Sequence, residues 1–431
     1  MNRLLIVSPH FPPVNAPDMQ RVRMSLPYFV AAGWEVTVLA ADDPDPIPPV
    51  EAELLATIPA AVRVVRVPCL GRRWLSRLGI NNLGWRVLPG LFRTGNQIIR
   101  AWRPDVVYFS TTQFITLPLG RIWRRRFDVP YVVDLQDPWV SDFYRRPGAP
   151  RPPGGWKYGI AAALAALLEG WTLRRAAHVL SVSPAYLEAF ARRYRWWQAS
   201  RGSVLTFGAP EADFAHVRQQ HGPRVLPPPG PNLRIAYAGR LGPDMVPALD
   251  ILFAAAARWK DEGRAVELCF YGTSYAGEGS VESTTTARAR HHGIAHLVQE
   301  HPRRIGYLAS LQLLLETDVA LLLGSGDEAY SPSKIYPTLL AGKPTLAIAP
   351  AGGALAHILE ELGGAALVAF DPAAGIDGEA VAAVAECLGQ ARANPTASLG
   401  KPLDGDRLRT RYSAAAVARR QIEVFAAACT G

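Results

Sequence analysis

The stretch "SPSKIYPTLLAGKPTLAI", residues 331–348, contains the pattern from which the fold can be inferred. A short helix is expected over 335–341, because Gly342 and Pro344 are typical of the residues that follow a helix. Pro337 lacks an N–H and disfavours helical geometry at the residue before it, which predicts a late or distorted first turn. The residues that follow form a short apolar run, as expected for a strand buried on both faces of a parallel sheet.

The same alternation of helical segments and apolar strands occurs in two series, separated by the Pro- and Gly-rich stretch "HGPRVLPPPGPNL". It predicts an α/β protein with two doubly wound, Rossmann-like domains that face each other across a cleft. We expect an N-terminal domain over 1–220, an extended linker over 221–233, a C-terminal domain over 234–410, and a terminal helix within 411–431 that crosses back to the first domain. The predicted strands are 3–9, 34–42, 62–68, 105–111, 130–137 and 178–184 in the first series, and 233–239, 266–272, 297–301, 318–324, 344–350 and 365–370 in the second.

Length and composition restrict the class of protein. A chain of 431 residues is too long for one ordinary core, and a composition of 49% hydrophobic and 19% charged residues excludes a disordered protein. The apolar run 4–7 is too short for a secretory signal, and the longest run, 160–168, is too short for a membrane span. Four cysteines lie far apart in no metal-binding spacing, which is typical of a reducing compartment. We expect a cytoplasmic protein and consider peripheral attachment to the inner face of the cell membrane.

The first half of the chain is strongly basic. Residues 1–205 contain 26 Lys and Arg against 14 Asp and Glu, whereas residues 206–431 contain 20 against 23. Three segments combine arginine with aromatic residues: 71–93, "RIWRRRF" (121–127) and "RRYRWW" (192–197). Such segments either bind an anionic membrane surface or form solvated faces whose tryptophans reach the core. We favour the membrane surface and expect no nucleic acid partner, because no nucleic-acid-binding motif accompanies the segments.

Two stretches of the second series together predict a diphosphate site. In "YAGRLGP", Gly239 allows a ligand to approach the backbone, and Arg240 offers a bidentate fork to phosphate. In "SPSK", Ser331 or Ser333 can cap a helix whose free N–H groups attract an anion, and Lys334 adds a full charge. Each stretch alone is better explained by an ordinary turn or helix cap. Together they predict a clamp for a diphosphate.

Candidate catalytic residues of the first half follow its strands. Asp134 and Asp137 lie near the carboxyl end of the strand predicted over 130–137, where paired carboxylates act as acid and base or bind a metal. The alternatives are a buried, satisfied Asp134 and a turn-capping Asp137. His10 lies in the loop after the first strand and is a candidate contact for a sugar or an acceptor, although a lone histidine is more often structural.

Four stretches of the chain, in their order and spacing, resemble the glycosyltransferase family 4-like proteins of the exopolysaccharide and lipopolysaccharide branch. These proteins share the GT-B fold. "SPSKIYPTLLAGKPTLAI" is similar to the family signature, "PYVVDLQDPW" to its DxRDxW box, "YAGRLGP" to the loop that opens the donor half, and residues 7–40 to the first strand, loop and helix. The resemblance implies a hexosyltransferase-like, retaining enzyme without a cofactor or a metal. Its donor, a UDP- or GDP-linked sugar, is expected in the C-terminal domain, and a glycan or lipid-linked acceptor in the N-terminal domain.

The resemblance also implies roles for individual residues. Asp137 follows Gln136, which stands where many relatives have a histidine, and the loop 8–16 is expected to face the acceptor. The implied residues are Asp137 and His10 for catalysis; Arg240, Lys334, Ser333 and Gly239 for the donor diphosphate; Glu328, Ser331 and Ile305 for the donor sugar or nucleoside; and Pro12, Asn15 and Arg21 for the acceptor side.

The chain departs from the family pattern at several positions. Many relatives carry two glutamates eight positions apart, the second of which binds the ribose; the aligned residues here are Ala329 and Pro337. Glu328 is a candidate replacement for the first. Met245 occupies a position where many relatives have a second basic residue. Ala16 and Pro17 occupy the positions of a glycine pair in the first loop. The alternative is therefore a catalytically inactive GT-B protein that binds a glycan, a nucleotide or a partner. An epimerase on the same fold would need acidic and histidine residues that are not evident.

Overall fold

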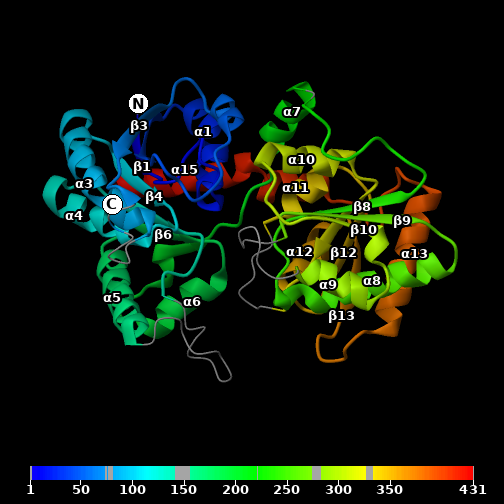
Figure 1. Ribbon diagram of the computed structural model, residues 1–431. Helices are drawn as coiled ribbons and strands as arrows, with labels where there is room; N and C mark the ends of the chain where they lie inside the picture. Colours follow the sequence, from blue (N-terminus) through cyan, green and yellow to red (C-terminus); the bar gives the residue numbers. More distant parts are fainter. Residues whose placement is uncertain are drawn as a thin grey trace. The chain divides into compact units, whose positions relative to one another are not determined.

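The computed structural model describes residues 2–72, 75, 81–140, 156–220, 222–273, 283–326 and 333–430. The chain forms two compact units, and each is built around one parallel sheet (Figure 1). The first unit comprises Met1–Gly208 and Ala414–Gly431, and the second comprises Ala209–Ser413. Helices cover both faces of both sheets, so the predicted α/β class with two doubly wound, Rossmann-like domains is confirmed.

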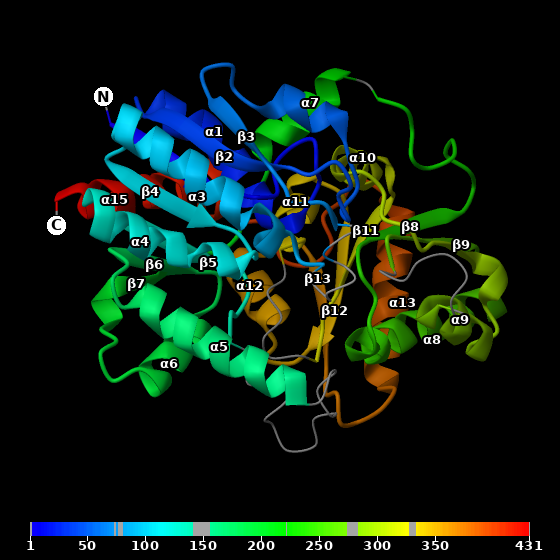
Figure 2. The same cartoon turned by 60° about the vertical axis from the view of Figure 1, so that its left-hand side comes forward.

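The first unit contains a seven-stranded parallel sheet in the order β3-β2-β1-β4-β5-β6-β7 (Figure 2). Its central strands follow the predicted apolar runs, and every residue of β4 and β5 is buried. The three-residue edge strand β7 was not predicted, because so short a segment shows no apolar pattern. The strands are β1 (Arg3–Val7), β2 (Glu35–Asp42), β3 (Arg63–Pro68), β4 (Val106–Ser110), β5 (Tyr131–Leu135), β6 (His178–Ser181) and β7 (Gly202–Val204).

Two layers of helices enclose this sheet. On one face, Leu26 and Phe29 of α1 share a core cluster with Phe425 of α15. On the opposite face, α3, α4 and the end of α5 surround Phe109, whose ring stacks on Trp123 at 5.8 Å. The helices are α1 (Gln20–Ala31), α3 (Leu83–Trp102), α4 (Pro118–Phe127), α5 (Trp156–Leu173), α6 (Pro184–Arg193) and α15 (Ala414–Thr430).

A buried polar network holds α1 and α15 on the sheet. Arg21 and Asp134 form an ion pair at 3.0 Å (Nε to Oδ2), and their side chains are 1% and 0% exposed. Tyr108 donates to the same carboxylate at 2.9 Å and accepts from Gln421 at 2.8 Å. Gln421 in turn accepts from Ser25 at 2.7 Å. Because all five residues are buried, loss of any one would leave a polar partner unsatisfied inside the core.

The second unit contains a six-stranded parallel sheet in the order β10-β9-β8-β11-β12-β13. Its main core lies beneath α8 and α13, and smaller clusters lie beneath α7 and α10. The strands are β8 (Leu233–Ala238), β9 (Val266–Tyr271), β10 (Val298–His301), β11 (Val319–Leu323), β12 (Thr345–Pro350) and β13 (Ala366–Phe370). The helices are α7 (Glu211–Gln220), α8 (Val246–Asp261), α9 (Thr284–His291), α10 (Tyr307–Glu316), α11 (Ile335–Leu340), α12 (Ala354–Leu362) and α13 (Gly378–Ala393).

The unit boundaries differ from the predicted domain boundaries. The chain passes from one unit to the other after residues 208 and 413, so α7 belongs to the second unit and not to the N-terminal domain. The reason is apolar packing, because Phe214 of α7 is buried in a cluster with α10. The stretch predicted as a linker, 221–233, lies within the second unit, and Leu226 in it is buried in that unit's core. α15 packs on the first unit.

The helix in the family signature is short and begins late. α11 spans only the six residues Ile335–Leu340, and Pro337 lies in its first turn. The predicted serine cap is wrong for Ser333, because Lys334 itself occupies the N-cap position and, among the described residues, no side chain caps the helix. Ser331 lies outside the described residues. A helix of this length has a weak dipole, so the positive charge at this place comes mainly from side chains.

Candidate functional site

The candidate site residues follow the strands at which each sheet reverses its order. In the first unit the order reverses between β1 and β4, and in the second between β8 and β11. Loops on the two sides of such a point diverge and leave room for a ligand at the carboxyl ends of the strands. The loops after β8 and β11 contain Arg240 and Ser325, and those after β1 and β4 contain His10 and Thr112.

In the second unit, the side chain of Lys334 lies directly over Gly239. A Cβ atom at position 239 would lie 1.6 Å from Nζ and 2.2 Å from Cε of Lys334, so only glycine leaves room for this side chain. The φ angle of Gly239, +142°, also favours glycine. Nζ donates a hydrogen bond to the Tyr237 hydroxyl at 3.0 Å and lies 4.6 Å from the centroid of the same ring. Gly239 thus allows the approach of a lysine from the same chain.

Arg240 is held by Asp244, a residue that sequence reasoning missed. The Asp244 carboxylate accepts hydrogen bonds from Nη1 and Nη2 of Arg240 at 3.0 and 2.9 Å, and from the Ser325 hydroxyl at 2.6 Å. Burial alone would raise the pKa of Asp244, but the hydrogen bonds from Arg240 and Ser325 lower it below its ordinary value. A Cβ atom on Gly242 would overlap Nη1 of Arg240 and Oδ1 of Asp244, so a larger residue here would displace this pair. The four-residue spacing of the pair is a sequence signal that could have suggested it.

The charges of two arginines, Arg240 and Arg304, both act on Lys334 at this edge. Sequence reasoning singled out Ile305 but not the adjacent arginine. Desolvation, followed by the charges of Arg240 and Arg304, lowers the pKa of Lys334 to about 7, although its side chain keeps some exposure to solvent. Within the described part of the chain, no carboxylate forms an ion pair with Lys334. A desolvated cation in such surroundings favours an anionic ligand.

The structure places the other predicted donor-site residues only in part. Ile305 is half-buried before α10, and Ser333 is exposed beside Lys334. Glu328, Ser331 and the aligned family position Ala329 lie outside the described residues. The cations are therefore the part of the predicted diphosphate site that the structure brings together.

In the first unit, Asp18 is the centre of a polar cluster that sequence reasoning missed. Its side chain is 4% exposed and lies 2.9 Å from His10 Nδ1. It accepts hydrogen bonds from the Thr111 hydroxyl at 3.1 Å and from the Thr112 amide and hydroxyl at 3.0 Å each. Burial would raise the pKa of Asp18, but the hydrogen bond and charge of His10 and the hydrogen bonds of Thr112 lower it below its ordinary value. No local sequence pattern links these residues, because they come from two loops.

Of the predicted catalytic residues, His10 belongs to this cluster, and Asp137 lies within electrostatic range of Asp18. Nδ1 of His10 faces Asp18, so Nε2 is the ring nitrogen that a substrate can use. Gln136 is buried and donates to the backbone carbonyl of Asp18 at 2.8 Å, which joins the loop after β5 to the cluster. Desolvation and the charge of Asp18 raise the pKa of Asp137, while the exposure of its side chain lets water screen both effects. The structure thus brings both residues to one edge of the sheet.

The predicted acceptor-side residues are buried and support the loop from within. Arg21 lies in α1, where it pairs with Asp134 and donates to two backbone carbonyls at 2.9 and 3.0 Å. Asn15 is 4% exposed and donates to Glu51 at 2.6 Å, and Pro12 is also buried. The expectation that these three side chains face an acceptor is therefore corrected. Asp134 is a structural residue, as the alternative interpretation proposed.

The basic-aromatic segments divide between the core and the surface. In 121–127, which lies in α4, Trp123 is fully buried, whereas Arg125 is exposed. Trp197 packs partly against the same core, and part of 71–93 lies outside the described residues. Most of the described aromatic rings of these segments thus reach the core, whereas the arginines divide: Arg125 is exposed, but Arg86 is buried and pairs with Asp43. None of the described helices has the length and apolar character that a membrane crossing requires.

Comparison with known proteins shows where this architecture occurs. Residues 20–208 match the family described as "Glycosyl transferase 4-like domain". The structure resembles sucrose-phosphate synthase from Thermosynechococcus elongatus (17% identity, TM-score 0.62, 99% of this chain and 98% of that chain). It also resembles trehalose-6-phosphate from E. coli bound with UDP-2-fluoro glucose (13%, 0.60, 98% and 99%). A third similar structure is WaaG, a glycosyltransferase involved in lipopolysaccharide biosynthesis (13%, 0.57, 98% and 99%). No curated protein sequence matches the chain.

The two kinds of comparison cover different parts of the chain. The family match lies within the first unit, whereas the structural similarity extends over both units. At these identities the structural similarity establishes the fold alone. The predicted resemblance is confirmed: residues 20–208 match the glycosyl transferase 4-like domain, and the chain has the GT-B fold that these glycosyltransferase structures share.

Proposed function

We propose that this protein is a retaining, metal-independent glycosyltransferase that moves a sugar from a UDP- or GDP-linked donor to a glycan or lipid-linked acceptor. The observation that carries the proposal is the position of Lys334 beside Arg240 and Arg304, at the point where the second sheet reverses its order. A nucleoside diphosphate leaving group gains negative charge during transfer, and fixed cations stabilise that charge. The E. coli structure with UDP-2-fluoro glucose supports a nucleotide sugar as the donor.

In the proposed reaction, the bond between the anomeric carbon and the β-phosphate oxygen breaks, and its electron pair stays on the nucleoside diphosphate. A bond forms between the same carbon and an acceptor hydroxyl oxygen, and the hydroxyl proton is released. Asp244 orients Arg240, and Gly239 leaves room for Lys334, so both cations are positioned before the donor binds. Because side chains supply the positive charge, the reaction needs no metal ion. Retention is proposed from the family resemblance.

We assign the cluster in the first unit to the acceptor side. Asp18 fixes the orientation of the His10 ring, which leaves Nε2 for a hydrogen bond to the sugar or the acceptor. Asp137 is exposed, and its raised pKa makes it a stronger base than an ordinary aspartate. We therefore propose that Asp137 accepts the proton that the acceptor hydroxyl releases.

Arg240→Ala and Lys334→Ala are each expected to weaken UDP or GDP binding about 10–100-fold, because each removes a charged hydrogen-bond donor from the diphosphate. Sugar transfer should fall by about 10²–10³-fold. Calorimetry with both nucleotides measures affinity, and mass spectrometry with a panel of nucleotide sugars measures transfer. Lys401→Ala, which removes an exposed lysine from the same unit, is the matched control and should change neither quantity.

Four results would count against this proposal. Equal nucleotide affinity in wild type and both variants would contradict the donor site. Nucleotide binding without transfer from any donor would favour the catalytically inactive GT-B protein. Conversion of the sugar without an acceptor product would favour an epimerase. A loss of turnover after treatment with EDTA would contradict metal independence.

Nucleotide affinity is expected to fall above pH 7. The pKa of Lys334 in the unliganded protein is about 7, and an anionic ligand raises it by favouring the charged form. Below that pH the lysine is already charged; above it, binding must take up a proton, and affinity falls by up to about tenfold per pH unit. Titration calorimetry between about pH 7 and 9, in buffers of different ionisation enthalpy, measures affinity and proton uptake together. Lys334→Arg stays charged and should lose the pH dependence. A flat wild-type profile would refute the coupling.

His10→Ala is expected to lower kcat by roughly 10²-fold, and Asp18→Asn by roughly tenfold because the neutral amide orients the ring less firmly. UDP affinity should not change. Since the pKa of Asp18 is depressed, the wild-type carboxylate stays ionised throughout neutral pH, and the effect of Asp18→Asn should be independent of pH there. Asp45→Asn, at an exposed aspartate of the same unit, is the control. Unchanged kcat in His10→Ala would remove this residue from the mechanism.

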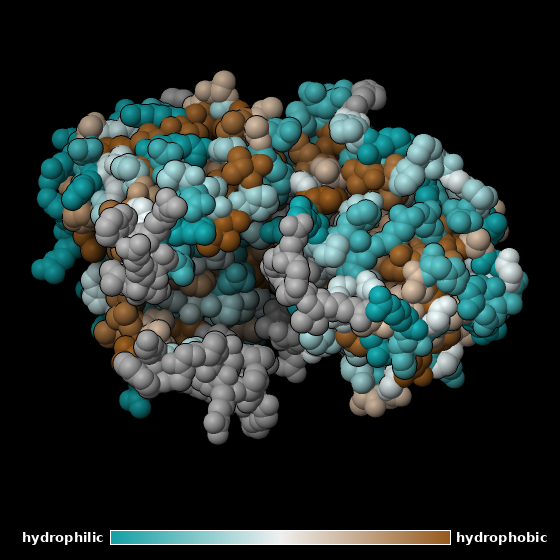
Figure 3. All heavy atoms as spheres, in the orientation of Figure 1, coloured by the Kyte–Doolittle hydropathy of each residue, from teal (hydrophilic) through white to brown (hydrophobic). Residues whose placement is uncertain are grey.

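We also propose that the first unit attaches to an anionic membrane surface through α5. An exposed apolar stripe runs along one face of this helix, and hydrophobic atoms are visible over α5 in Figure 3. Arg121 lies 4.4 Å from the centroid of one ring of the stripe, and Arg125 and Arg126 of α4 are exposed. Apolar side chains next to arginines suit a surface of anionic lipid. The stripe consists of Ile160, Leu164, Leu167 and Trp171, which are 60%, 43%, 68% and 38% exposed.

Leu167→Ser/Trp171→Ser is expected to weaken binding to phosphatidylglycerol vesicles by about tenfold or more, because it removes two large apolar contacts. Vesicle flotation measures the effect, and vesicles of phosphatidylcholine alone should bind poorly. Ile376→Ser, at an exposed isoleucine of the second unit, should bind like wild type. Equal flotation of the double variant and wild type would exclude α5 as the attachment site.

A further inference from the structure

A cavity of about 730 Å³ lies in the first unit, at the opposite end of the strands from the His10–Asp18 cluster. Its wall includes His178, the first residue of β6, whereas the cluster follows the carboxyl ends of β1 and β4. Edge strand β7, the end of α5, one residue of α4 and the C-terminal part of α15 complete the wall, and these elements lie next to one another in Figure 2. Cavities of this size accommodate small-molecule ligands.

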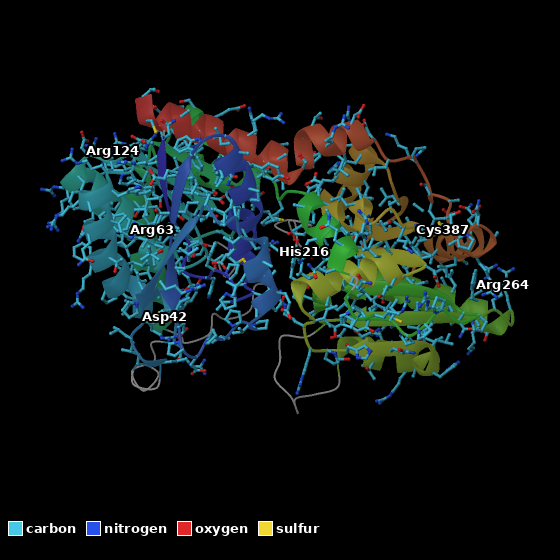
Figure 4. The ribbon with its side chains drawn as sticks, turned by 90° about the horizontal axis from the view of Figure 1, so that it is seen from above. Asp42, Arg63, Arg124, His216, Arg264 and Cys387 are labelled. Atoms are coloured by element: carbon cyan, nitrogen blue, oxygen red, sulfur yellow. The ribbon has the colours of Figure 1, made fainter. Side chains whose placement is uncertain are left out.

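The charge of the cavity wall is almost entirely positive. Five arginines line it, and the only carboxylate on the wall, that of Glu423, pairs with Arg420 at 3.1 Å. In the described part of the chain, the other four arginines form no ion pair. Arg124, at the outer edge of the first unit in Figure 4, is one of them. The remaining three are Arg174, Arg175 and Arg201.

Only some of these arginines form hydrogen bonds that stabilise the fold. Arg201 donates to three backbone carbonyls at and just beyond the end of α5, at 2.6–3.2 Å, and so caps that helix. Arg124 makes one long hydrogen bond, 3.4 Å, to the backbone carbonyl of Arg175. Arg174 and Arg175 themselves are exposed, and no described residue accepts a hydrogen bond from their guanidinium groups. The guanidinium groups of Arg174 and Arg175 are thus available to bind a ligand in the cavity.

The cationic groups repel one another. Desolvation lowers the pKa of Arg201; Tyr131 opposes this shift, while the charges of Arg124 and Arg175 add to it. Desolvation and the charge of Arg201 likewise lower the pKa of His178, whose Nε2 lies 2.8 Å from the Ser203 hydroxyl. An anion in the cavity would relieve this repulsion.

We propose that this cavity is a second ligand site that binds a phosphate group, carried either by a small soluble phosphorylated compound or by a lipid headgroup. Arginine forks match the oxygens of phosphate, and the hydroxyl of Ser203 adds a neutral hydrogen-bonding group. The site is separate from the proposed donor site, because all its lining residues belong to the first unit, whereas Arg240 and Lys334 belong to the second.

The test uses inorganic pyrophosphate and full-length protein carrying Arg240→Ala/Lys334→Ala, so that the proposed donor site contributes nothing. Calorimetry at low ionic strength should still detect binding. Adding Arg174→Gln/Arg175→Gln should weaken it by about tenfold or more, because two charged hydrogen-bond donors are lost. Adding Arg63→Gln/Arg100→Gln removes the same charge from exposed positions outside the cavity and should leave affinity nearly unchanged. Arg420→Gln, on the exposed face of α15, provides a second cavity variant should the first fail to fold.

Two results would overturn the proposal: no pyrophosphate binding in the Arg240→Ala/Lys334→Ala protein, or an equal loss in the Arg63→Gln/Arg100→Gln control. Vesicles identify the source of the phosphate. Flotation with phosphatidylglycerol vesicles that pyrophosphate inhibits, and that Arg174→Gln/Arg175→Gln abolishes, supports a lipid headgroup. Pyrophosphate binding without such competition supports a soluble compound. Failure of the donor-site proposal would appear as unchanged UDP affinity in Arg240→Ala and Lys334→Ala, which leaves the cavity result unaffected.

Discussion

Parallel strand pairing is the constraint on which the rest of the structure depends. Because every strand runs in the same direction, each must be joined to the next by a crossover, and all loops of one kind collect at one edge of the sheet. The strands of both units are mainly apolar, and a charge inside the sheets needs a partner, as Asp134 of β5 has in Arg21. Polar side chains therefore gather where the strand order reverses, and residues far apart in the sequence, such as Arg240 and Lys334, become neighbours.

In the second unit, the cations are organised at a cost to the unliganded protein. Lys334 is desolvated and lies near two arginines, and it occupies the space that a side chain at Gly239 would need. Asp244 offsets part of this repulsion by holding Arg240, and Ser325 links that pair to the loop after β11. Such an arrangement is expected of an anion-binding site, because its positively charged side chains repel one another until an anion binds.

The first unit places different chemistry at the two ends of its strands. At the carboxyl ends, Asp18 orients His10 and lies near Asp137, so the charge of this edge is mainly negative. At the amino ends, arginines surround a cavity with one carboxylate, which is itself paired. The basic character of the first half of the chain is therefore a property of its surface and its amino-terminal edge. Trp123 and Trp197, which suggested a membrane interface, mainly complete the core.

The sequence by itself determined the fold class, because apolar runs, glycines and prolines act within a few residues of one another. It also predicted, through a motif, that Arg240 and Lys334 lie together, and the structure brings them close to each other. Only the tertiary structure decided that Asp18 and Asp244 hold the site residues and that Arg304 joins the cations. It likewise showed that Arg21, Asn15 and Pro12 are buried and that α7 belongs to the second unit. The physical reason is that burial and pairing between loops depend on which strands become neighbours, and no local pattern carries that information.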